Sequence, residues 1–287
     1  MKRNKETLNN ILYHICFGMW WCFSKLPFCF HYAMSDIFSA ILFHLVRYRR
    51  ELVHKNMMDS FPDKTEKDLR KHIEFRGMDL LAESSSRGKS CGIFVGHYGN
   101  WEWQSSIPMC FEPGTFLVTQ LYHPLENPVF DRLIAYTRER FGGKNIPVNE
   151  SVRHFVKYKK EGTPIIIGFL ADQVPFWNNI HYFTSFLNHP DTPVFTGPER
   201  LMKKFDMDVY YLDMWRPKRG HYIAEYKRIT TTPNDYKEFE LTELYTRMLE
   251  ETIYRAPQYW LWSHNRWKRT KAEWEKIIDL ENHKMRT

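Results

Sequence analysis

Short apolar segments alternate with helical patterns along most of this chain. Residues 91–95 read CGIFV and residues 164–170 read PIIIGFL, and such short apolar runs are typical of strands buried on both faces. Because strands that alternate with helices form layered folds, we expect a single α/β domain in which helices flank a mixed, largely buried sheet. The other predicted strands are residues 115–121, 146–148, 209–214 and 222–229, and the predicted helices are residues 65–81, 101–108, 127–141, 151–160, 198–205 and 242–254.

The first 50 residues differ in character from the rest. No Asp, Glu, Lys or Arg occurs from Thr7 to Ser24, a run of 18 residues that lies at the lower limit for crossing a bilayer. A second apolar stretch, residues 37–46, is shorter and leads into three arginines. No small-residue cleavage site follows, so we expect residues 1–50 to form uncleaved, membrane-associated helices that lie in or partly cross the bilayer. The alternative is a pair of buried helices in a soluble protein.

The net charge of +7 is concentrated at the two ends of the chain. Residues 1–60 carry eight Lys and Arg against four Asp and Glu, and residues 266–287 carry seven against four. A nucleic-acid-binding protein usually spreads its basic surface over one folded face, so we expect no nucleic-acid partner. Basic ends beside abundant aromatic residues favour an anionic membrane surface instead. The alternative is that these ends are simply solvated.

The cysteine and histidine patterns predict neither disulfides nor a metal centre. The five cysteines are odd in number and form no CxxC pair, so we expect reduced thiols in a protein that faces the cytosol. The thirteen histidines show no metal-ligand spacing and no HExxH motif. We therefore expect no metal and no bound cofactor.

The stretch GHYGNWEW, residues 96–103, places His97 five residues before Glu102 at the end of a predicted strand. On a continuous helix these side chains would point about 140° apart, so only a strand-to-helix turn would bring them together. A carboxylate on one imidazole nitrogen leaves the other nitrogen free to take a proton from an alcohol. His97 and Glu102 are thus a candidate base and orienting acid, and the alternative is an ordinary structural pair.

Two other candidate motifs fail. Gly88-Lys89-Ser90 resembles the end of a phosphate-binding loop, but Glu83 stands where that motif requires glycine. No GxSxG elbow occurs, so a serine hydrolase is not supported. Near the C-terminus, Arg266, Lys268 and Arg269 are interleaved with tryptophans. That pattern favours contact with a headgroup or phosphate over simple solvation.

Several ordered blocks resemble the bacterial late acyltransferases of lipid A biosynthesis, within the lysophospholipid acyltransferase-like superfamily. GHYGNWEW resembles the family's H-x4-(D/E) block, and the resemblance covers about residues 35–270. The other blocks are LYHPLENPVFDRLIAYTRERFG (121–142), GTPIIIGFLADQVP (162–175), FTGPERLMKKFDMDV (195–209) and APQYWLWSHNRWKRT (256–270).

The resemblance implies a role for individual residues. His97 would be the general base and Glu102 its partner. Arg138 matches the family arginine required for activity, and Asp172 matches the aspartate of the second block. One departure concerns the family's Tyr-Arg-Pro segment, which reads Tyr122-His123-Pro124 here, so a permanent cation is replaced by a titratable one. The residues expected to contact substrate are Arg138, Asp172, Gln173, His123 and Asn100.

The resemblance also implies an activity for residues 51–287, as an acyltransferase domain. We expect transfer of a fatty acyl chain from acyl carrier protein to a hydroxyl of a lipid A precursor, at the cell inner membrane with the catalytic domain facing the cytoplasm. One alternative keeps this chemistry on another bacterial glycolipid or an amino-acid-linked lipid. Others are a non-catalytic membrane scaffold and a thioesterase.

Overall fold

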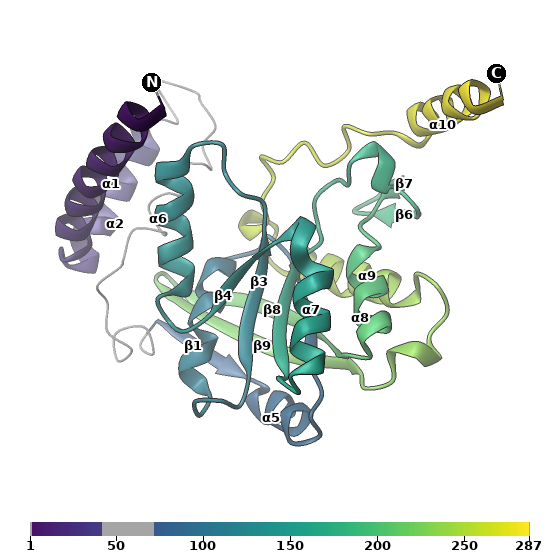
Figure 1. Cartoon of the computed structure of the whole chain (residues 1–287), viewed down its shortest axis with the longest axis horizontal. Helices are drawn as coiled ribbons and strands as arrows, with labels where there is room; N and C mark the ends of the chain where they lie inside the picture. Colours follow the sequence, from purple (N-terminus) through teal and green to yellow (C-terminus); the bar gives the residue numbers. More distant parts are fainter. Residues whose placement is uncertain (1, 42–71, 287) are drawn as a thin grey trace.

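The structure, a computed structural model, describes residues 2–41 and 72–286 (Figure 1). Its strands are β1 (Ile73–Arg76), β2 (Cys91–Val95), β3 (Leu117–Tyr122), β4 (Lys144–Pro147), β5 (Ile165–Leu170), β6 (Phe183–Phe186), β7 (His189–Pro193), β8 (Asp208–Lys218) and β9 (His221–Thr230). Its α-helices are α1 (Lys2–Ser24), α2 (Phe28–Ile41), α5 (Met78–Ser86), α6 (Pro128–Glu139), α7 (Ser151–Lys160), α8 (Gly197–Phe205), α9 (Glu240–Arg255) and α10 (Lys271–Arg286). The 3-10 helices used below are η2 (Trp101–Cys110) and η6 (Pro257–Tyr259).

Seven strands form the central sheet, in the order β1-β9-β8-β2-β5-β3-β4. Strands β8, β2, β5, β3 and β4 are parallel, whereas β9 runs antiparallel to β8 and pairs in parallel with β1. Strand β2 is buried along its whole length and lies in the middle of the sheet, as its apolar sequence predicts. The expected mixed, largely buried sheet is therefore confirmed.

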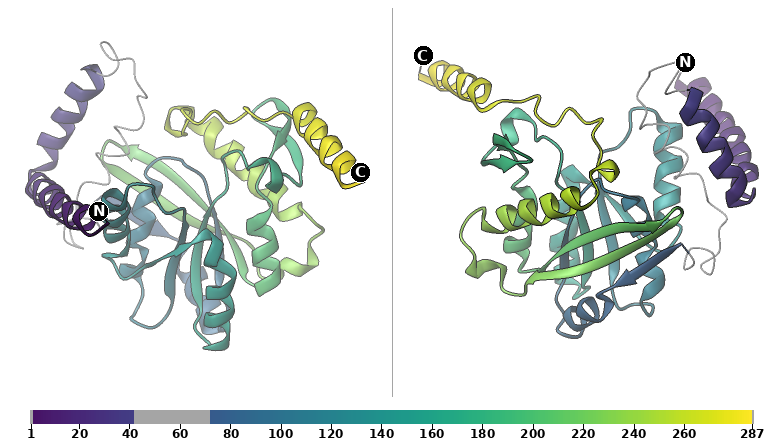
Figure 2. Two further views of the ribbon diagram at one scale, coloured as in Figure 1. Left: turned by 45° about the horizontal axis from the view of Figure 1, so that its top comes forward. Right: turned by 180° about the vertical axis from the view of Figure 1, so that it is seen from behind.

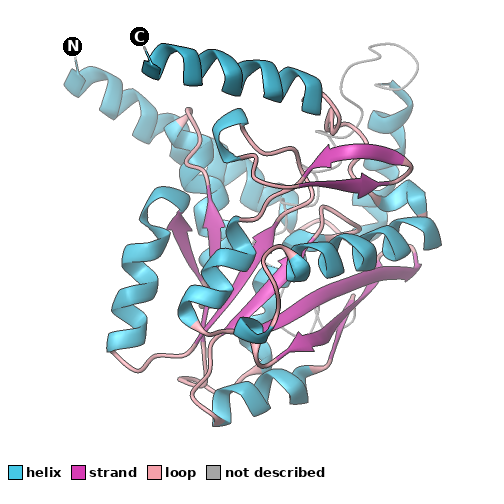
Figure 3. Ribbon diagram, turned by 90° about the vertical axis from the view of Figure 1, so that its right-hand side faces the viewer, coloured by secondary structure: helices cyan, strands magenta, loops and turns pink. Residues whose placement is uncertain are grey.

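Helices cover both faces of this sheet (Figure 3). A Cβ added to Gly92 would meet the side chain of Met202 in α8 at 2.6 Å, so α8 lies directly against one face of β2. On the same face, the Phe94 ring stacks on Tyr245 of α9 with centroids 4.6 Å apart. A Cβ added to Gly168 would meet the side chain of Gln104 at 3.1 Å, which places η2 on the opposite face.

The N-terminal helix α1 packs against α6 at one edge of the molecule (Figure 1). The Phe17 ring meets Tyr136 edge-on at 5.5 Å, and the Arg132 guanidinium lies 3.9 Å from the centroid of Tyr13. Within the described part of the chain, no helix has the length and apolar character needed to cross a membrane. The side of α1 turned away from α6 exposes an apolar stripe, formed by Leu8, Ile11, Leu12, Ile15 and Met19.

After α9 the chain passes the carboxyl ends of the central strands before it reaches α10 (Figure 2). We call residues 256–270, which make this passage, the C-terminal strap. The antiparallel hairpin of β6 and β7 packs beside it, against α9 and α10 (Figure 3). The strap therefore lies beside the end of the sheet where functional groups gather in open α/β folds.

One predicted element is wrong. The helix expected over residues 65–81 lies partly outside the described residues, and its described part contains β1 and the start of α5. Ile73 and Phe75 alternate with Glu74 and Arg76, a period of two that suits a strand, and β9 supplies the pairing partner that the local sequence does not reveal. The hairpin of β6 and β7 was not predicted, because its residues show no clear apolar alternation. The other predicted strands and helices are present, with ends that differ by a few residues and with residues 101–110 forming 3-10 rather than α-helix.

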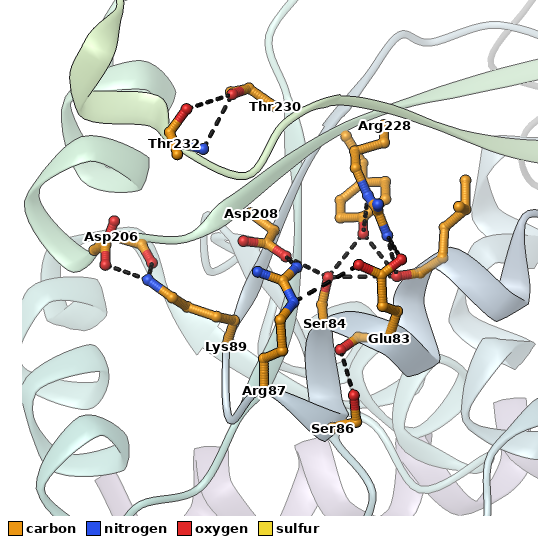
Figure 4. A network of polar contacts seen from close by, with 12 residues as sticks. Glu83, Ser84, Ser86, Arg87, Lys89, Asp206, Asp208, Arg228, Thr230 and Thr232 are labelled. Carbon is orange, nitrogen blue, oxygen red and sulfur yellow. Dashed lines mark hydrogen bonds and ion pairs between the residues drawn. The ribbon is translucent and has the colours of Figure 1, made fainter.

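A polar network closes the amino end of the sheet (Figure 4). Asp208, at the start of β8, is fully buried. It accepts a 2.5 Å hydrogen bond from Ser84 and forms an ion pair with Arg87. Arg228 of β9 pairs with Glu83 at 2.6 Å. Lys89, which belongs to the sequence that only partly matches a phosphate-binding loop, forms an ion pair with Asp206. Its role in this structure is therefore to tie the segment before β2 to the segment before β8.

Candidate active site

The register of the sheet brings His97 and Asp172 together. Strands β2 and β5 are parallel neighbours in which Val95 pairs with Leu170. His97 and Asp172 each lie two residues beyond these paired positions, so they leave adjacent strands at the same level. Carboxyl ends of parallel strands meet at one edge of a sheet, which is where side chains from distant segments converge.

His97 and Asp172 are joined by two hydrogen bonds. Nδ1 of His97 lies 2.6 Å from Oδ1 of Asp172, and the backbone N–H of His97 donates to Oδ2 at 3.0 Å. The Asp172 side chain is 2% exposed, whereas that of His97 is 13% exposed. This arrangement assigns the Nδ1 proton to the bond with Asp172 and leaves Nε2 as the basic nitrogen.

The strap supplies a third bond to Asp172. The indole N–H of Trp260 donates to Oδ2 at 2.8 Å, and Trp260 is itself buried. Burial alone raises the pKa of Asp172, but His97 and the Trp260 hydrogen bond outweigh it and hold that pKa below its ordinary value. Asp172 is therefore ionised over the physiological range.

The segment that follows Asp172 is also fixed by hydrogen bonds. The side-chain amide of Gln173 lies 3.3 Å from Nε2 of His97, the nitrogen that Asp172 leaves free. The backbone N–H of Val174 donates to Nε2 of His264 at 3.2 Å. Burial, followed by the charges of Lys268 and Arg266, lowers the pKa of His264, so its neutral form accepts this bond.

Glu102 does not hold the imidazole, contrary to the sequence-based prediction. It binds Arg138 of α6 instead, with Nε donating to Oε2 at 2.9 Å and Nη2 donating to Oε1 at 2.5 Å. Asp172 occupies the Nδ1 position because it extends from the neighbouring strand, whereas η2 carries Glu102 on toward α6. Arg138 is largely buried and is therefore no ordinary surface charge.

Glycine permits the turn that carries His97 out of the sheet. Gly99 has φ +62°, in the left-handed region that side-chain-bearing residues rarely adopt. A Cβ on Gly96 would meet Leu249 of α9 at 2.7 Å, so α9 approaches the backbone closely at this point. Asn100, which follows the turn, is buried, and its carbonyl accepts from the N–H of Trp103 at 3.1 Å at the start of η2.

A cleft that is open to solvent lies beside this site between β2, β3, β5 and η2. Trp101 lines it, and the Trp101 ring meets the His97 imidazole edge-on with centroids 5.0 Å apart. Its lining includes apolar side chains as well as the charged residues Glu102, Arg138 and Lys144. The apolar lining residues are Val95, Val118, Leu121 and Leu170. Such a mixed lining suits an amphipathic ligand.

The remaining predicted residues have different environments. His123 is exposed in the loop after β3. Arg266 is 2% exposed and donates to the carbonyl of Pro193 at 2.7 Å, so the predicted headgroup contact is wrong for this residue. Burial lowers the pKa of Arg266 to about 10. Arg269 donates to the carbonyl of Pro175 at 2.9 Å, which ties the strap to the loop that follows Gln173.

Sequence reasoning did not identify Trp260 and His264 as site residues. Both lie in the C-terminal block that resembles a family segment, and their spacing beside two further tryptophans was the only signal available. Within residues 2–41 and 72–286, no group of three or more His, Cys, Asp or Glu side chains is placed to hold a metal ion.

Comparison with known proteins identifies the family of this chain. The profile of the bacterial lipid A biosynthesis acyltransferases matches residues 65–269. A lipid A biosynthesis acyltransferase of Haemophilus influenzae is 29% identical over 99 residues, which cover 34% of this chain and 30% of that protein. The chain thus matches less than a third of the length of this curated relative. Because the family profile spans most of the sequence, including the His97 turn, Asp172 and the strap, the chain belongs to the bacterial lipid A biosynthesis acyltransferase family.

Proposed function

We propose that this protein transfers a fatty acyl chain from an acyl carrier protein thioester to a hydroxyl of a lipid A precursor. The observation that carries the proposal is the 2.6 Å bond between His97 and Asp172 beside a mixed apolar and cationic cleft. Family membership supports the reaction class and a lipid A-type acceptor. Acyl carrier protein as the donor rests on the family resemblance.

The proposed reaction needs no covalent enzyme intermediate. Nε2 of His97 takes the proton from the acceptor hydroxyl, whose oxygen attacks the thioester carbonyl carbon. The carbon–sulfur bond then breaks, and the leaving thiolate takes from Nε2 the proton that came from the acceptor hydroxyl. Asp172 fixes the imidazole tautomer and stabilises the transient imidazolium. For this step the acceptor hydroxyl takes the place of the Gln173 amide, which lies 3.3 Å from Nε2.

Arg138 and Lys144 give the cleft a cationic end. The guanidinium of Arg138 is held in place by its two bonds to Glu102, and Lys144 lies exposed at the same cleft. We assign this end to an anionic group of the acceptor or donor, because a fixed guanidinium binds phosphate or carboxylate in a defined orientation. Glu102 then acts on the substrate through Arg138 rather than on the base.

The membrane part of the proposal rests on α1. Its exposed apolar stripe, defined above, follows helical spacing, and basic residues Lys2, Arg3 and Lys5 precede it in the sequence. An amphipathic helix of this kind binds at the boundary between headgroups and acyl chains. We propose that the protein sits at the inner membrane with its active site toward the cytoplasm, where carrier-protein thioesters are made.

The decisive experiment replaces the base. His97→Ala should lower transfer of labelled acyl chains from carrier protein to purified lipid A precursor by at least about 10³-fold, as removal of a general base does in comparable sites. The readout is mass spectrometry of the product lipid, with unfolding curves to verify the fold. His154→Ala on α7 serves as the control, since His154 lies away from the cleft and pairs with Glu150.

Each outcome discriminates between functions. Full activity in His97→Ala would reject the mechanism. Release of free fatty acid at the same rate with and without acceptor would identify a thioesterase. Transfer to another glycolipid but not to the lipid A precursor would retain the chemistry and reject the acceptor.

A further inference from the structure

The C-terminal strap pairs with the catalytic turn through its backbone. The N–H of Gly99 donates to the carbonyl of Tyr259 at 2.9 Å, and the N–H of Leu261 donates to the carbonyl of His97 at 3.1 Å. Tyr98 and Trp260 form an isolated antiparallel bridge between these bonds. The strap therefore behaves as a short extra strand that holds the backbone on both sides of Tyr98, directly after His97.

Three tryptophans of the strap use their indole N–H groups differently. Trp262 donates to the carbonyl of Pro257 at 2.6 Å, within the strap itself. Trp267 donates to the hydroxyl of Thr192 in β7 at 3.2 Å. Among these three, Trp260 alone reaches the catalytic carboxylate, at 2.8 Å from Oδ2 of Asp172.

The two carboxylate oxygens of Asp172 have different hydrogen-bond partners. Oδ2 accepts the indole N–H of Trp260 and the backbone N–H of His97, whereas Oδ1 accepts the imidazole Nδ1–H. Two donors on one oxygen prevent the carboxylate from rotating, so Oδ1 stays directed at the imidazole. Pre-organisation of this kind maintains the orientation of a catalytic base between turnovers.

The indole of Trp260 is itself held rigidly. It is 5% exposed, and its ring meets Phe186 of β6 edge-on with centroids 5.7 Å apart and Trp262 edge-on at 4.7 Å. A donor fixed by packing loses little freedom when it forms its hydrogen bond. The hairpin, the strap and the carboxylate thus form one continuous packed unit behind the base.

We infer that Trp260 is a positioning residue for acyl transfer, which acts on the base through Asp172 without contacting substrate. This inference rests on the proposed function. It predicts that removal of the indole N–H lowers the rate of the chemical step and leaves substrate binding unchanged, since Trp260 is buried and its N–H donates to Asp172.

The test compares Trp260→Phe with a variant that carries benzothienylalanine at position 262, in the full-length protein. Trp260→Phe should lower kcat by about tenfold with KM unchanged, the size expected for a lost hydrogen bond to a charged group. Benzothienylalanine at position 262 removes an equivalent N–H donor from the same strap and keeps the ring that packs on Trp260, so kcat and KM should be unchanged. Unchanged kcat in Trp260→Phe would overturn the inference, and so would an equal loss in both variants.

A spectroscopic measurement separates this inference from the proposed function. The downfield proton NMR signal of His97 Nδ1–H, assigned by its absence in His97→Ala, reports the bond to Asp172 without any substrate. The signal should shift or broaden in Trp260→Phe and stay unchanged with benzothienylalanine at position 262. If the wild-type protein transferred no acyl chain, the proposed function would fail while this signal still tested the role of Trp260.

A second variant covers the case in which Trp260→Phe does not fold. Benzothienylalanine at position 260 keeps the shape of the ring and removes only the N–H donor. The same loss of kcat and the same change in the His97 signal are expected. A normal signal and normal kcat with this residue would overturn the inference.

Discussion

Each end of the central sheet holds a buried aspartate, but the two aspartates have different kinds of partner. At the carboxyl end, Asp172 binds an imidazole and an indole beside an open cleft. At the amino end, Asp208 binds the hydroxyl of Ser84 and the guanidinium of Arg87 (Figure 4).

The partner decides what each carboxylate can do. An imidazole can accept a proton on one nitrogen and then donate it again, so Asp172 can support proton transfer. A guanidinium stays protonated, so the pair of Asp208 and Arg87 can only hold segments together. Asp208 thereby joins α5 to the start of β8, two segments far apart in sequence. Burial of a charged group by itself therefore does not identify a catalytic residue in this fold.

The largest effect that separates the two ends is expected from Asp172→Asn. The amide cannot hold the correct imidazole tautomer, so kcat should fall by roughly 10³-fold while the protein stays folded. Steady-state kinetics measure this loss. Glu102→Gln provides the matched comparison, because it weakens the contact with Arg138 and should act mainly on KM. A kcat loss in Glu102→Gln as large as that in Asp172→Asn would return Glu102 to the role predicted from sequence.

The next effect is on stability, at the amino end. Asp208→Asn leaves Arg87 without its buried partner and should lower the free energy of unfolding by about 3 kcal/mol. Urea denaturation measures the change, and kcat per folded molecule should be unchanged. Asp206→Asn is the control, because its pair with Lys89 is solvent-exposed and is worth at most about 1 kcal/mol. Lower kcat in folded Asp208→Asn protein would show that the two ends are coupled.

The smallest expected effect is on the free energy of unfolding at acidic pH. The pKa of Asp172 is lower in the folded protein than its ordinary value of 3.8, so its ionised form stabilises the fold above that value. This contribution is lost as the pH falls through the lowered pKa. The free energy of unfolding of wild-type protein, measured relative to Asp172→Asn, should therefore decrease as the pH falls below about 4. A difference that grew in acid would contradict the assigned direction.

Sequence alone identified the type of most elements and two of the residues that meet at the site. The apolar runs at residues 91–95 and 164–170 predict buried strands because no other short element buries both faces. His97 and Asp172 each follow one of these strands by two residues, and the family resemblance marked both. Arg138 was predicted in the same way, and the structure brings it to the cleft.

Only the tertiary structure decided which partners these residues have. The pairing of His97 with Asp172 requires β2 and β5 to be neighbours, and their chain positions are more than 70 residues apart with β3 and β4 between them. Local patterns report burial and periodicity, but strand order depends on how all helices and strands bury their apolar faces together. For the same reason, spacing in the sequence suggested Glu102 as the partner of the imidazole, a role that Asp172 has in the structure. No local signal could show that Trp260 donates a hydrogen bond to Asp172.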